Sequence, residues 1–407
     1  MSKIVVKKIK KSKTIIEIKY TVSDELKEFF NLDNYFKVDY YEDVTKVPDS
    51  IAVIPFISNV LPIIWLTDSE LVIDELDEAY AKSINKTRKA FNDMYETNIF
   101  KGKVTINKTI TNKPLKRKEN TSVFCSGGVD STLSLVKCLK KNQKPLLITI
   151  WGTDVWDHNT EGWSSLNEYA TSLGKKLKLK NLFVKTNFRK FIYEHVLTEK
   201  LLKAKINDSW WRGIQHGIGL LGHVAPIAYL HNIKEHYIPA TLNKKNLGAT
   251  CGSFPTIDES VKFIDCKIKH SGYEYTRLEK VENIVKYFKK EKVNLRVCFM
   301  DKGAKLNCCN CEKCYLTIME LISVGANPRD YGFDITDEEI AKIPAYLKAK
   351  ASDSPINIEI WDAIIEKCYK NRDYIMSNPN YKWILKYRNQ RNIISYLLWR
   401  SRLWNMV

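Results

Sequence analysis

The sequence predicts an α/β fold whose centre is a doubly wound parallel sheet. Between about residues 122 and 299, short apolar runs alternate with segments whose apolar residues recur at helical spacing. This is the pattern of a parallel sheet covered on both faces. A glycine-rich turn separates the first apolar run from the helix that follows it. The chain of 407 residues is also long enough for two or three domains with cores of their own.

The central region, residues 121–327, is expected to carry this sheet. Its first strand ends at Phe124, and later strands are expected at residues 145–151, 181–186, 235–239, 261–267 and 295–298. Helices are expected at residues 131–141, 164–177, 213–231 and 277–290. Ligands of doubly wound sheets lie beyond the carboxyl ends of the strands. The residues that follow each strand are therefore the candidates for a functional site.

Two regions are expected to flank the sheet. Residues 1–115 predict an N-terminal α+β domain with a long amphipathic helix whose apolar face runs from Ile73 to Tyr95. Its β-rich runs are residues 4–6, 14–20, 36–41 and 51–57. The polar stretch 112–120 is a plausible linker. Residues 328–407 predict a helical C-terminal region, in which Thr336 and Glu339 have the spacing of a capping box.

Composition narrows the class of protein. The formal net charge of +18 would suit tRNA or another nucleic acid, but the excess is mostly lysine and is spread along the chain. No apolar run approaches the ~20 residues of a membrane span, and no apolar core follows the basic start of the chain, as a signal peptide requires. We therefore expect a cytoplasmic protein, in which ten cysteines would not form a disulfide framework.

The C-terminal tail combines aromatic and basic side chains. Such a tail could stack on nucleic acid, lie on a membrane surface, or pack on the neighbouring domain. The residues concerned are Trp383, Trp399, Trp404, Arg388, Arg391, Arg400 and Arg402.

The glycine-rich turn has the chemistry of a phosphate site. A turn at a helix N-terminus presents backbone N–H groups to an anion, and the helix dipole favours negative charge there. Gly127 and Gly128 let the main chain approach closely, and Asp130 can cap the helix. Three hydroxyls can donate to phosphate oxygens: those of Ser126, Ser131 and Thr132.

The run Ser-Gly-Gly-Val-Asp-Ser at residues 126–131 resembles the signature of the PP-loop ATP pyrophosphatases, the adenine nucleotide alpha hydrolase-like superfamily. The resemblance implies a PP-loop (HUP-like) fold that binds Mg²⁺ and ATP, grips the β,γ-pyrophosphate and directs attack at the α-phosphate. No Gly-Lys-Ser/Thr follows at the Walker spacing, so γ-phosphate transfer is not indicated. A plain turn of the same composition is the alternative.

Other candidate residues follow the later strands. The resemblance places the adenosine near Trp151, and Asp154 could hold a substrate group or a magnesium-bound water, although Asp is common in such loops. His216 opens a helix and titrates near neutrality, so it could steer an anion or simply cap its own helix. The loop from Gly252 to Asp258 is expected to position substrate.

A basic pair opens a later helix. The resemblance implies that Arg277 and Lys280 meet the leaving pyrophosphate, because charge-assisted contacts stabilise a departing anion. Together with Asp130, Ser131 and His216, they complete the candidate catalytic set.

The cysteines supply the second strong motif. Cys298 and the spacing Cys308-x-x-Cys311-x-x-Cys314 provide four thiolates, enough to close a tetrahedral Zn²⁺ site with a structural role. This arrangement resembles the zinc site of the 7-cyano-7-deazaguanine synthase family, and the resemblance covers about residues 121–325. Cys309 stands where that pattern prefers glycine, so either Cys308 or Cys309 could be the ligand. An iron–sulfur cluster is the alternative.

These observations favour an AMP-forming, ATP-dependent ligase. A carboxylate or amide oxygen of a small-molecule acceptor would be adenylated with release of pyrophosphate, and ammonia or an amine would then displace AMP. Two alternatives remain. One is sulfur transfer to tRNA or a small molecule, with Cys125 or Cys251 as relay. The other is a nucleotide-sensing or nucleic-acid-binding module without catalysis.

Overall fold

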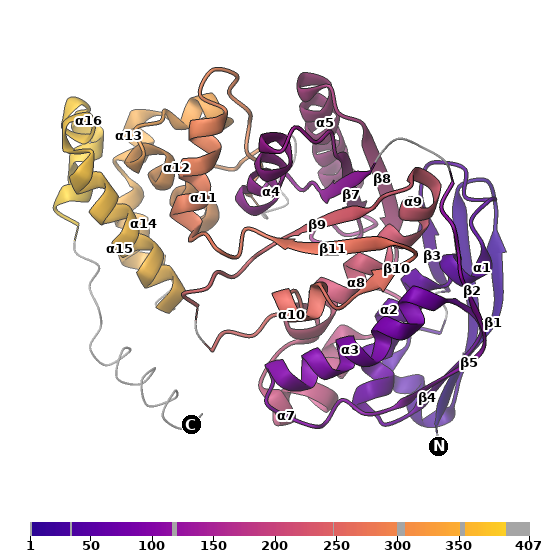
Figure 1. Ribbon diagram of the computed structural model, residues 1–407. Helices are drawn as coiled ribbons and strands as arrows, with labels where there is room; N and C mark the ends of the chain where they lie inside the picture. The colour runs from indigo at the N-terminus through magenta and orange to yellow at the C-terminus, as the bar shows by residue number, and fades with distance from the viewer. Residues whose placement is uncertain are drawn as a thin grey trace. The chain divides into compact units, whose positions relative to one another are not determined.

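The computed structural model describes residues 2–32, 35–115, 120–246, 248–298, 306–350 and 355–387 (Figure 1). The chain forms two compact units. The first comprises Met1–Ser126 and Asp130–Glu274, and the second comprises Gly127–Val129 and Tyr275–Val407. The tail residues beyond 387 and the linker residues 116–119 lie outside the described ranges.

The first unit contains one mixed sheet. Within the described residues its eleven strands lie in the order β10-β11-β9-β6-β7-β8-β3-β2-β1-β4-β5, and most neighbouring pairs are parallel. This confirms the expected α/β class. The strands are β1 (Lys3–Lys11), β2 (Ile15–Val22), β3 (Phe36–Asp39), β4 (Glu70–Asp77), β5 (Lys103–Ile110), β6 (Thr121–Phe124), β7 (Leu146–Trp151), β8 (Asn181–Thr186), β9 (Glu235–Pro239), β10 (Lys262–Phe263) and β11 (Cys266–Ser271).

The five strands β11, β9, β6, β7 and β8 are parallel throughout. The next strand along the chain, β7, pairs with one edge of β6 (Phe124 opposite Ile148). The later strand β9 pairs with the other edge (Val123 opposite Tyr237). The order of the strands therefore reverses at β6. In open α/β sheets the carboxyl end of such a strand borders the ligand crevice.

The N-terminal strands continue this sheet. β3 pairs antiparallel with β8 through Val38 and Thr186, and β2, β1, β4 and β5 follow in turn. Strands from residues 3–110 are thus hydrogen bonded into the same sheet as the central strands. The domain boundaries expected from the sequence stay a prediction.

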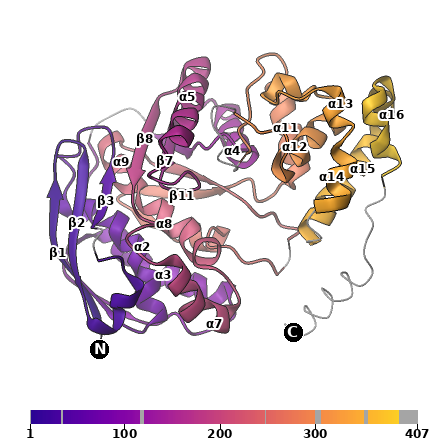
Figure 2. The same cartoon turned by 180° about the vertical axis from the view of Figure 1, so that it is seen from behind.

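Helices cover both faces of the central strands, as Figures 1 and 2 show. On one face, Trp163 of α5 (Thr160–Leu177) stacks on Trp151 of β7 with ring centroids 5.0 Å apart. On the other face, Ile148 and Ile150 join a core that also contains residues of α2 (Ile54–Leu66), α8 (His216–Gly222) and α9 (Val224–His231). Every residue of β7 is buried for this reason. The arrangement is compatible with a doubly wound fold.

Among the remaining helices of the first unit, α3 (Glu78–Met94) and α4 (Val129–Lys140) are long and the others are short. A π-helix over Trp210–Gln215 leads into α8. The α-helices are α1 (Asp49–Ala52), α3 (Glu78–Met94), α4 (Val129–Lys140, which begins in the second unit), α6 (Glu194–Leu197), α7 (Ala204–Ile206) and α10 (Pro255–Asp258). No helix in the described ranges combines the length and the apolar character that crossing a membrane requires.

Four expected elements differ from the structure. Residues 51–57 form α1 and the start of α2 instead of a strand. Ile73 lies in β4, so the helix expected to begin near it begins at Glu78, where the Asp77 side chain accepts from the backbone N–H of Tyr80. The expected strand at 261–267 is replaced by β10 and β11. Residues 295–298 form no strand.

The described part of the second unit is helical. Contacts join α11 (Arg277–Tyr287), α12 (Glu312–Ser323) and α15 (Pro355–Lys370). The expected capping box is confirmed: Thr336 and Glu339 hydrogen bond reciprocally at the start of α13. The other α-helices of this unit are α13 (Asp337–Ile340), α14 (Ile343–Lys350) and α16 (Arg372–Ser377).

Candidate functional site

The glycine-rich turn forms between strand and helix as expected. β6 ends at Phe124 and α4 begins at Val129. The backbone N–H of Cys125 donates to Ile148 O at 2.8 Å, so pairing with β7 extends one residue beyond β6. Gly127 adopts a φ of 83°, in the left-handed region that side chains disfavour. The turn therefore depends on glycine at this position.

Hydroxyl groups brace this turn from within. Ser126 Oγ donates to Ser131 Oγ at 3.2 Å, which spans the turn. Ser131 and Thr132 are buried at 5% and 2% exposure, and Asp130 lies in the first turn of α4. The turn is thus a braced structure at the N-terminus of a twelve-residue helix, where the helix dipole favours an anion.

The loop after β7 packs tightly on β8. Gly152 has a φ of 111°, and a Cβ atom there would lie 2.1 Å from the carbonyl oxygen of Thr186. The Trp151 indole is used in packing: its Nε1 donates to Trp156 O at 2.7 Å, and Lys185 Nζ lies 3.8 Å from the ring centroid. The predicted contact of this strand end with adenosine stays a prediction.

His216 lies among charged residues from several loops. It is the first residue of α8, and its Nδ1 lies 3.6 Å from Cys251 Sγ. Burial lowers the pKa of His216, and the negative charges of Asp154 and Asp258 oppose this shift. Arg189 lowers the same pKa, and Asp130 raises it. The predicted candidates Asp130 and Asp154 therefore both lie within electrostatic reach of His216.

A buried carboxylate lies next to the start of α8. Asp258 is fully buried, and its Oδ2 accepts from Ser253 Oγ and pairs with His270 Nδ1, both at 2.7 Å. A Cβ on Gly217 would lie 2.6 Å from Asp258 Oδ1. His270, near the end of β11, was not singled out from the sequence. Its position just before the end of a parallel strand is the signal that could have identified it.

An aromatic cavity opens on the same unit. It has a volume of about 630 Å³. The Arg189 guanidinium lies 4.6 Å from the Trp156 ring and 4.2 Å from the Trp211 ring, and both rings line the cavity. Glu194 binds the same guanidinium through two bonds of 2.6 and 2.7 Å. A third bond of 3.0 Å runs from Arg189 to Thr153 O, which connects the cavity wall to the loop after β7.

The basic pair expected at the pyrophosphate lies in the second unit. Arg277 Nε lies 3.2 Å from Oε1 of Glu320, a fully buried residue of α12. The Arg277 guanidinium also donates to Thr317 Oγ1 at 2.9 Å. Lys280 is buried at 2% exposure. Arg277 thus serves the packing of α11 on α12, and the pyrophosphate contact of both residues stays a prediction.

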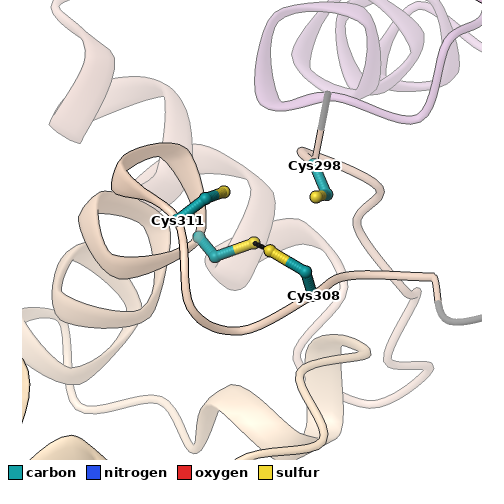
Figure 3. Close-up of side chains that lie close together, drawn as sticks. Cys298, Cys308 and Cys311 are labelled. Atoms are coloured by element: carbon teal, nitrogen blue, oxygen red, sulfur yellow. Dashed lines mark hydrogen bonds between the residues drawn. The ribbon is translucent and has the colours of Figure 1, made fainter. Parts of the chain in front are cut away.

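Four cysteines of the second unit converge into a four-thiol cluster, defined as Cys298, Cys308, Cys311 and Cys314. Their sulfur atoms all lie within 4.8 Å of one another. Figure 3 shows Cys298 on one segment and Cys308 and Cys311 on the turn that leads into α12, with their side chains directed toward one another. Cys311 precedes α12, and Cys314 lies in its first turn. This cluster could hold a metal ion.

The geometry of the cluster fits zinc. Zinc–sulfur bonds of about 2.3 Å in a tetrahedral site place two sulfur atoms about 3.8 Å apart, and the sulfur atoms of Cys308 and Cys314 are 3.9 Å apart. Hydrogen bonding from Cys314 lowers the pKa of Cys311 to about 5, while burial raises the pKa of Cys308 to about 11. A bound cation would favour the thiolate form of every ligand.

The structure distinguishes between Cys308 and Cys309 as the candidate ligand. Cys309 lies outside the four-thiol cluster, and its Sγ instead contacts Asn307 O at 3.7 Å. Cys309 has a φ of 56°, in the left-handed region. This conformation explains physically why glycine would suit the position.

Asn307 anchors the segment that carries Cys298 and was not recognised from the sequence. Its side chain is buried at 3% exposure. Oδ1 accepts from the backbone N–H groups of Val297 and Cys298 at 3.0 and 3.3 Å. Nδ2 donates to the carbonyl oxygens of Leu295 and Gly332 at 2.7 and 3.0 Å. All four hydrogen-bonding positions of the amide are therefore used.

The comparisons with known proteins add no relative: no protein-family model matches the chain, and no curated protein matches it.

Proposed function

We propose that the protein is an AMP-forming, ATP-dependent ligase of the PP-loop type. Mg-ATP binds with its pyrophosphate on residues 126–131, and an acceptor oxygen attacks the α-phosphate. Pyrophosphate leaves, and ammonia or an amine then displaces AMP from the adenylated acceptor. The observation that carries this proposal is the position of the glycine turn, at the carboxyl end of the strand where the sheet order reverses.

The turn has the features that phosphate binding requires. The left-handed conformation of Gly127 turns the main chain sharply into the N-terminus of α4, where N–H groups and the helix dipole stabilise negative charge. Asp130 and Ser131 lie in the first turn of the same helix. The protein contributes by holding the reacting groups in place and by stabilising the leaving pyrophosphate.

The aromatic cavity supports a small-molecule acceptor. Trp156, Trp211 and Arg189 line the cavity together, with the guanidinium against both rings, and such an aromatic wall suits a planar ligand. Arg189 joins this wall to Thr153 O, in the loop that the proposal places beside the adenosine. The acceptor would therefore enter next to the nucleotide.

The four-thiol cluster supports a structural zinc ion. Four protein sulfurs would fill a tetrahedral site and leave no position for substrate. When bound, zinc would contribute folding free energy and not a chemical step.

The burial of the relay thiols disfavours sulfur transfer. Cys125 and Cys251 are both buried, at 5% and 3% exposure. Burial raises the pKa of Cys251 to about 11, so its thiolate is scarce at neutral pH. A relay cysteine needs an accessible thiolate.

The products of ATP turnover test the proposal. Small molecules released from protein purified from its own host would be identified by mass spectrometry and added back together with Mg-ATP. Phosphorus NMR should then show AMP and pyrophosphate, formed only in the presence of the acceptor. Formation of ADP and orthophosphate would contradict the proposal, because it would indicate attack at the γ-phosphate.

A further inference from the structure

The segment that carries Cys298 is hydrogen bonded to the glycine turn. The backbone N–H of Arg296 donates to the carbonyl oxygen of Gly127 at 2.8 Å, and both residues belong to the second unit. Gly127 is the residue whose left-handed conformation shapes the turn. Only Val297 separates Arg296 from Cys298, a member of the four-thiol cluster. A short piece of chain thus connects the cluster with the turn.

Asn307 fixes this piece of chain. Its amide oxygen binds the N–H groups of Val297 and Cys298, and its amide nitrogen binds Leu295 O. Arg296 is therefore flanked on both sides by residues that Asn307 holds. A buried amide with all its bonds satisfied specifies one arrangement, because any other would leave buried polar groups unpaired.

A metal ion would join the same two segments a second time. Cys298 comes just after Val297, and Cys308 directly follows Asn307. An ion bound to both sulfurs would therefore connect the same two segments that the Asn307 side chain connects by hydrogen bonds. Without a cation, neighbouring thiols attract one another weakly and thiolates repel one another. Binding free energy at a structural site acts as folding free energy for the segments that supply its ligands.

We propose that a metal ion in the four-thiol cluster positions the phosphate turn through Arg296 and Asn307, which act as positioning residues. The metal holds residues 295–298 in place, and the Arg296 N–H in turn holds the carbonyl of Gly127. Coupling between two binding events is reciprocal. Mg-ATP on the turn therefore tightens binding of the metal, and loss of the metal weakens Mg-ATP binding. The nucleotide half of this proposal rests on the proposed function.

Amide hydrogen exchange in the absence of nucleotide tests whether the metal holds the segment that contains Arg296. Exchange at Arg296 is compared between the zinc-loaded protein and protein stripped with a chelator, with the amides of β7 as internal reference. We expect Arg296 to exchange at least about fivefold faster without zinc, the lower end of ordinary coupling, while β7 is unchanged. An unchanged rate at Arg296 would overturn the proposal. Equal acceleration in β7 would also overturn it, since the effect would then be global.

Zinc affinity tests the nucleotide half in the unmodified protein. The partition of zinc between the protein and a chromogenic chelator is measured at equilibrium with and without Mg-ATP, with Mg²⁺ alone as control. Mg-ATP should tighten zinc binding at least about fivefold, and the same affinity in both conditions would contradict the coupling. Calorimetry of Mg-ATP on zinc-loaded protein separates the two proposals. If Mg-ATP does not bind there, the proposed function fails, and the exchange result at Arg296 still decides the link.

An Asn307→Ala variant separates positioning from metal binding, because it keeps all four cysteines. We expect it to bind one zinc ion per chain but to bind Mg-ATP at least about fivefold more weakly. Cys309→Ser is the matched control, since its sulfur lies outside the four-thiol cluster. Wild-type Mg-ATP affinity in a zinc-loaded Asn307→Ala protein would contradict the role of Asn307. If this variant does not fold, the measurements on unmodified protein decide.

Discussion

Both candidate sites depend on single residues, and the role of each residue depends on the conformation and position of its backbone. Gly127 and Cys309 both adopt left-handed conformations, although only Gly127 does so without a side-chain penalty. Residue type and spacing identified Cys298, Cys311 and Cys314 and left Cys308 and Cys309 as alternatives for the fourth thiol, which the structure decides for Cys308. They did not identify Asn307 or His270, because nothing in the sequence near these residues shows which distant groups their side chains meet.

Replacing Asp130 tests the phosphate turn at this scale. Asp130→Ala should abolish ATP turnover and leave the fold intact, since losing a favourable group at a helix start costs about 1 kcal/mol, against a typical folding stability of about 5–15 kcal/mol. Glu161→Ala removes a first-turn carboxylate from α5 and serves as the matched control. Turnover and far-UV circular dichroism would be measured for both variants. Near wild-type activity in Asp130→Ala would show that the turn does not bind the nucleotide as proposed.

The four-thiol cluster makes a second prediction for single residues. Cys311→Ser should lower zinc content and thermal stability together, because it removes one of four ligands whose binding contributes to folding. Cys309→Ser should change neither, as its sulfur lies outside the four-thiol cluster. Elemental analysis and melting curves of anaerobically purified protein measure both quantities. Iron with acid-labile sulfide in place of zinc would refute the zinc assignment.

At the scale of elements, the central strands β7, β8 and β9 were predicted to within one residue, and the continuously apolar helix α2 was not predicted. β8 and β9 coincide with their expected ranges. The run at 51–57 was interpreted as a strand, but every residue of α2 is buried. A fully buried helix has no polar face, so periodicity cannot distinguish it from a buried strand.

Residues 295–298 show a different cause of error. Their sequence suits a strand, yet their N–H groups donate to Tyr331 O, Gly127 O and the Asn307 side chain. The backbone donors are satisfied without a neighbouring strand. Sequence patterns carry no information about such partners, because Asn307 and Tyr331 lie in other parts of the chain.

The contact between the β7 loop and β8 gives a prediction for elements. Gly152→Ala should destabilise the protein by about 3 kcal/mol, because a side chain at φ 111° is strained and its Cβ would lie 2.1 Å from Thr186 O. Gly248→Ala is the matched control: Gly248 also has a positive φ, of 74°, but no atom lies within 4 Å of its Cβ position. We expect about 1 kcal/mol there. Urea denaturation measures both, and equal losses would exclude the steric explanation.

At the scale of the whole molecule, the sequence predicted the α/β class and the parallel centre of the sheet. It did not predict that the N-terminal strands pair with β8, since β3 meets β8 through a contact between distant residues. The candidate residues were predicted on separate loops, and the sheet order explains why these loops share the carboxyl ends of the strands. His270 lies near the carboxyl end of β11, the glycine turn follows that of β6, and Asp154 follows that of β7, and these strands are parallel.

Buried histidines in the first unit make its stability depend on pH. His223 is fully buried, with its ring nitrogens bonded to Gly219 O at 2.8 Å and Thr186 Oγ1 at 3.0 Å. Burial lowers the pKa of His223 to about 4, below the value of about 6.5 in an unfolded chain. Between these values the unfolded state binds more protons, so folding stability falls as the pH falls.

The size of this effect follows from the shift. When the pH falls from 7 to 5, His223 takes up a proton in the unfolded chain but stays neutral in the folded protein. This difference should lower the folding stability by about 2 kcal/mol. His236, whose pKa burial lowers to about 3, should contribute a similar loss. Urea denaturation of the wild type and of His223→Gln at both pH values measures the contribution of His223. Because glutamine does not titrate, the variant should lose about 2 kcal/mol less than the wild type on acidification. Equal losses would mean that the pKa of His223 is the same in the folded and the unfolded protein, against its burial and the two bonds that its ring makes.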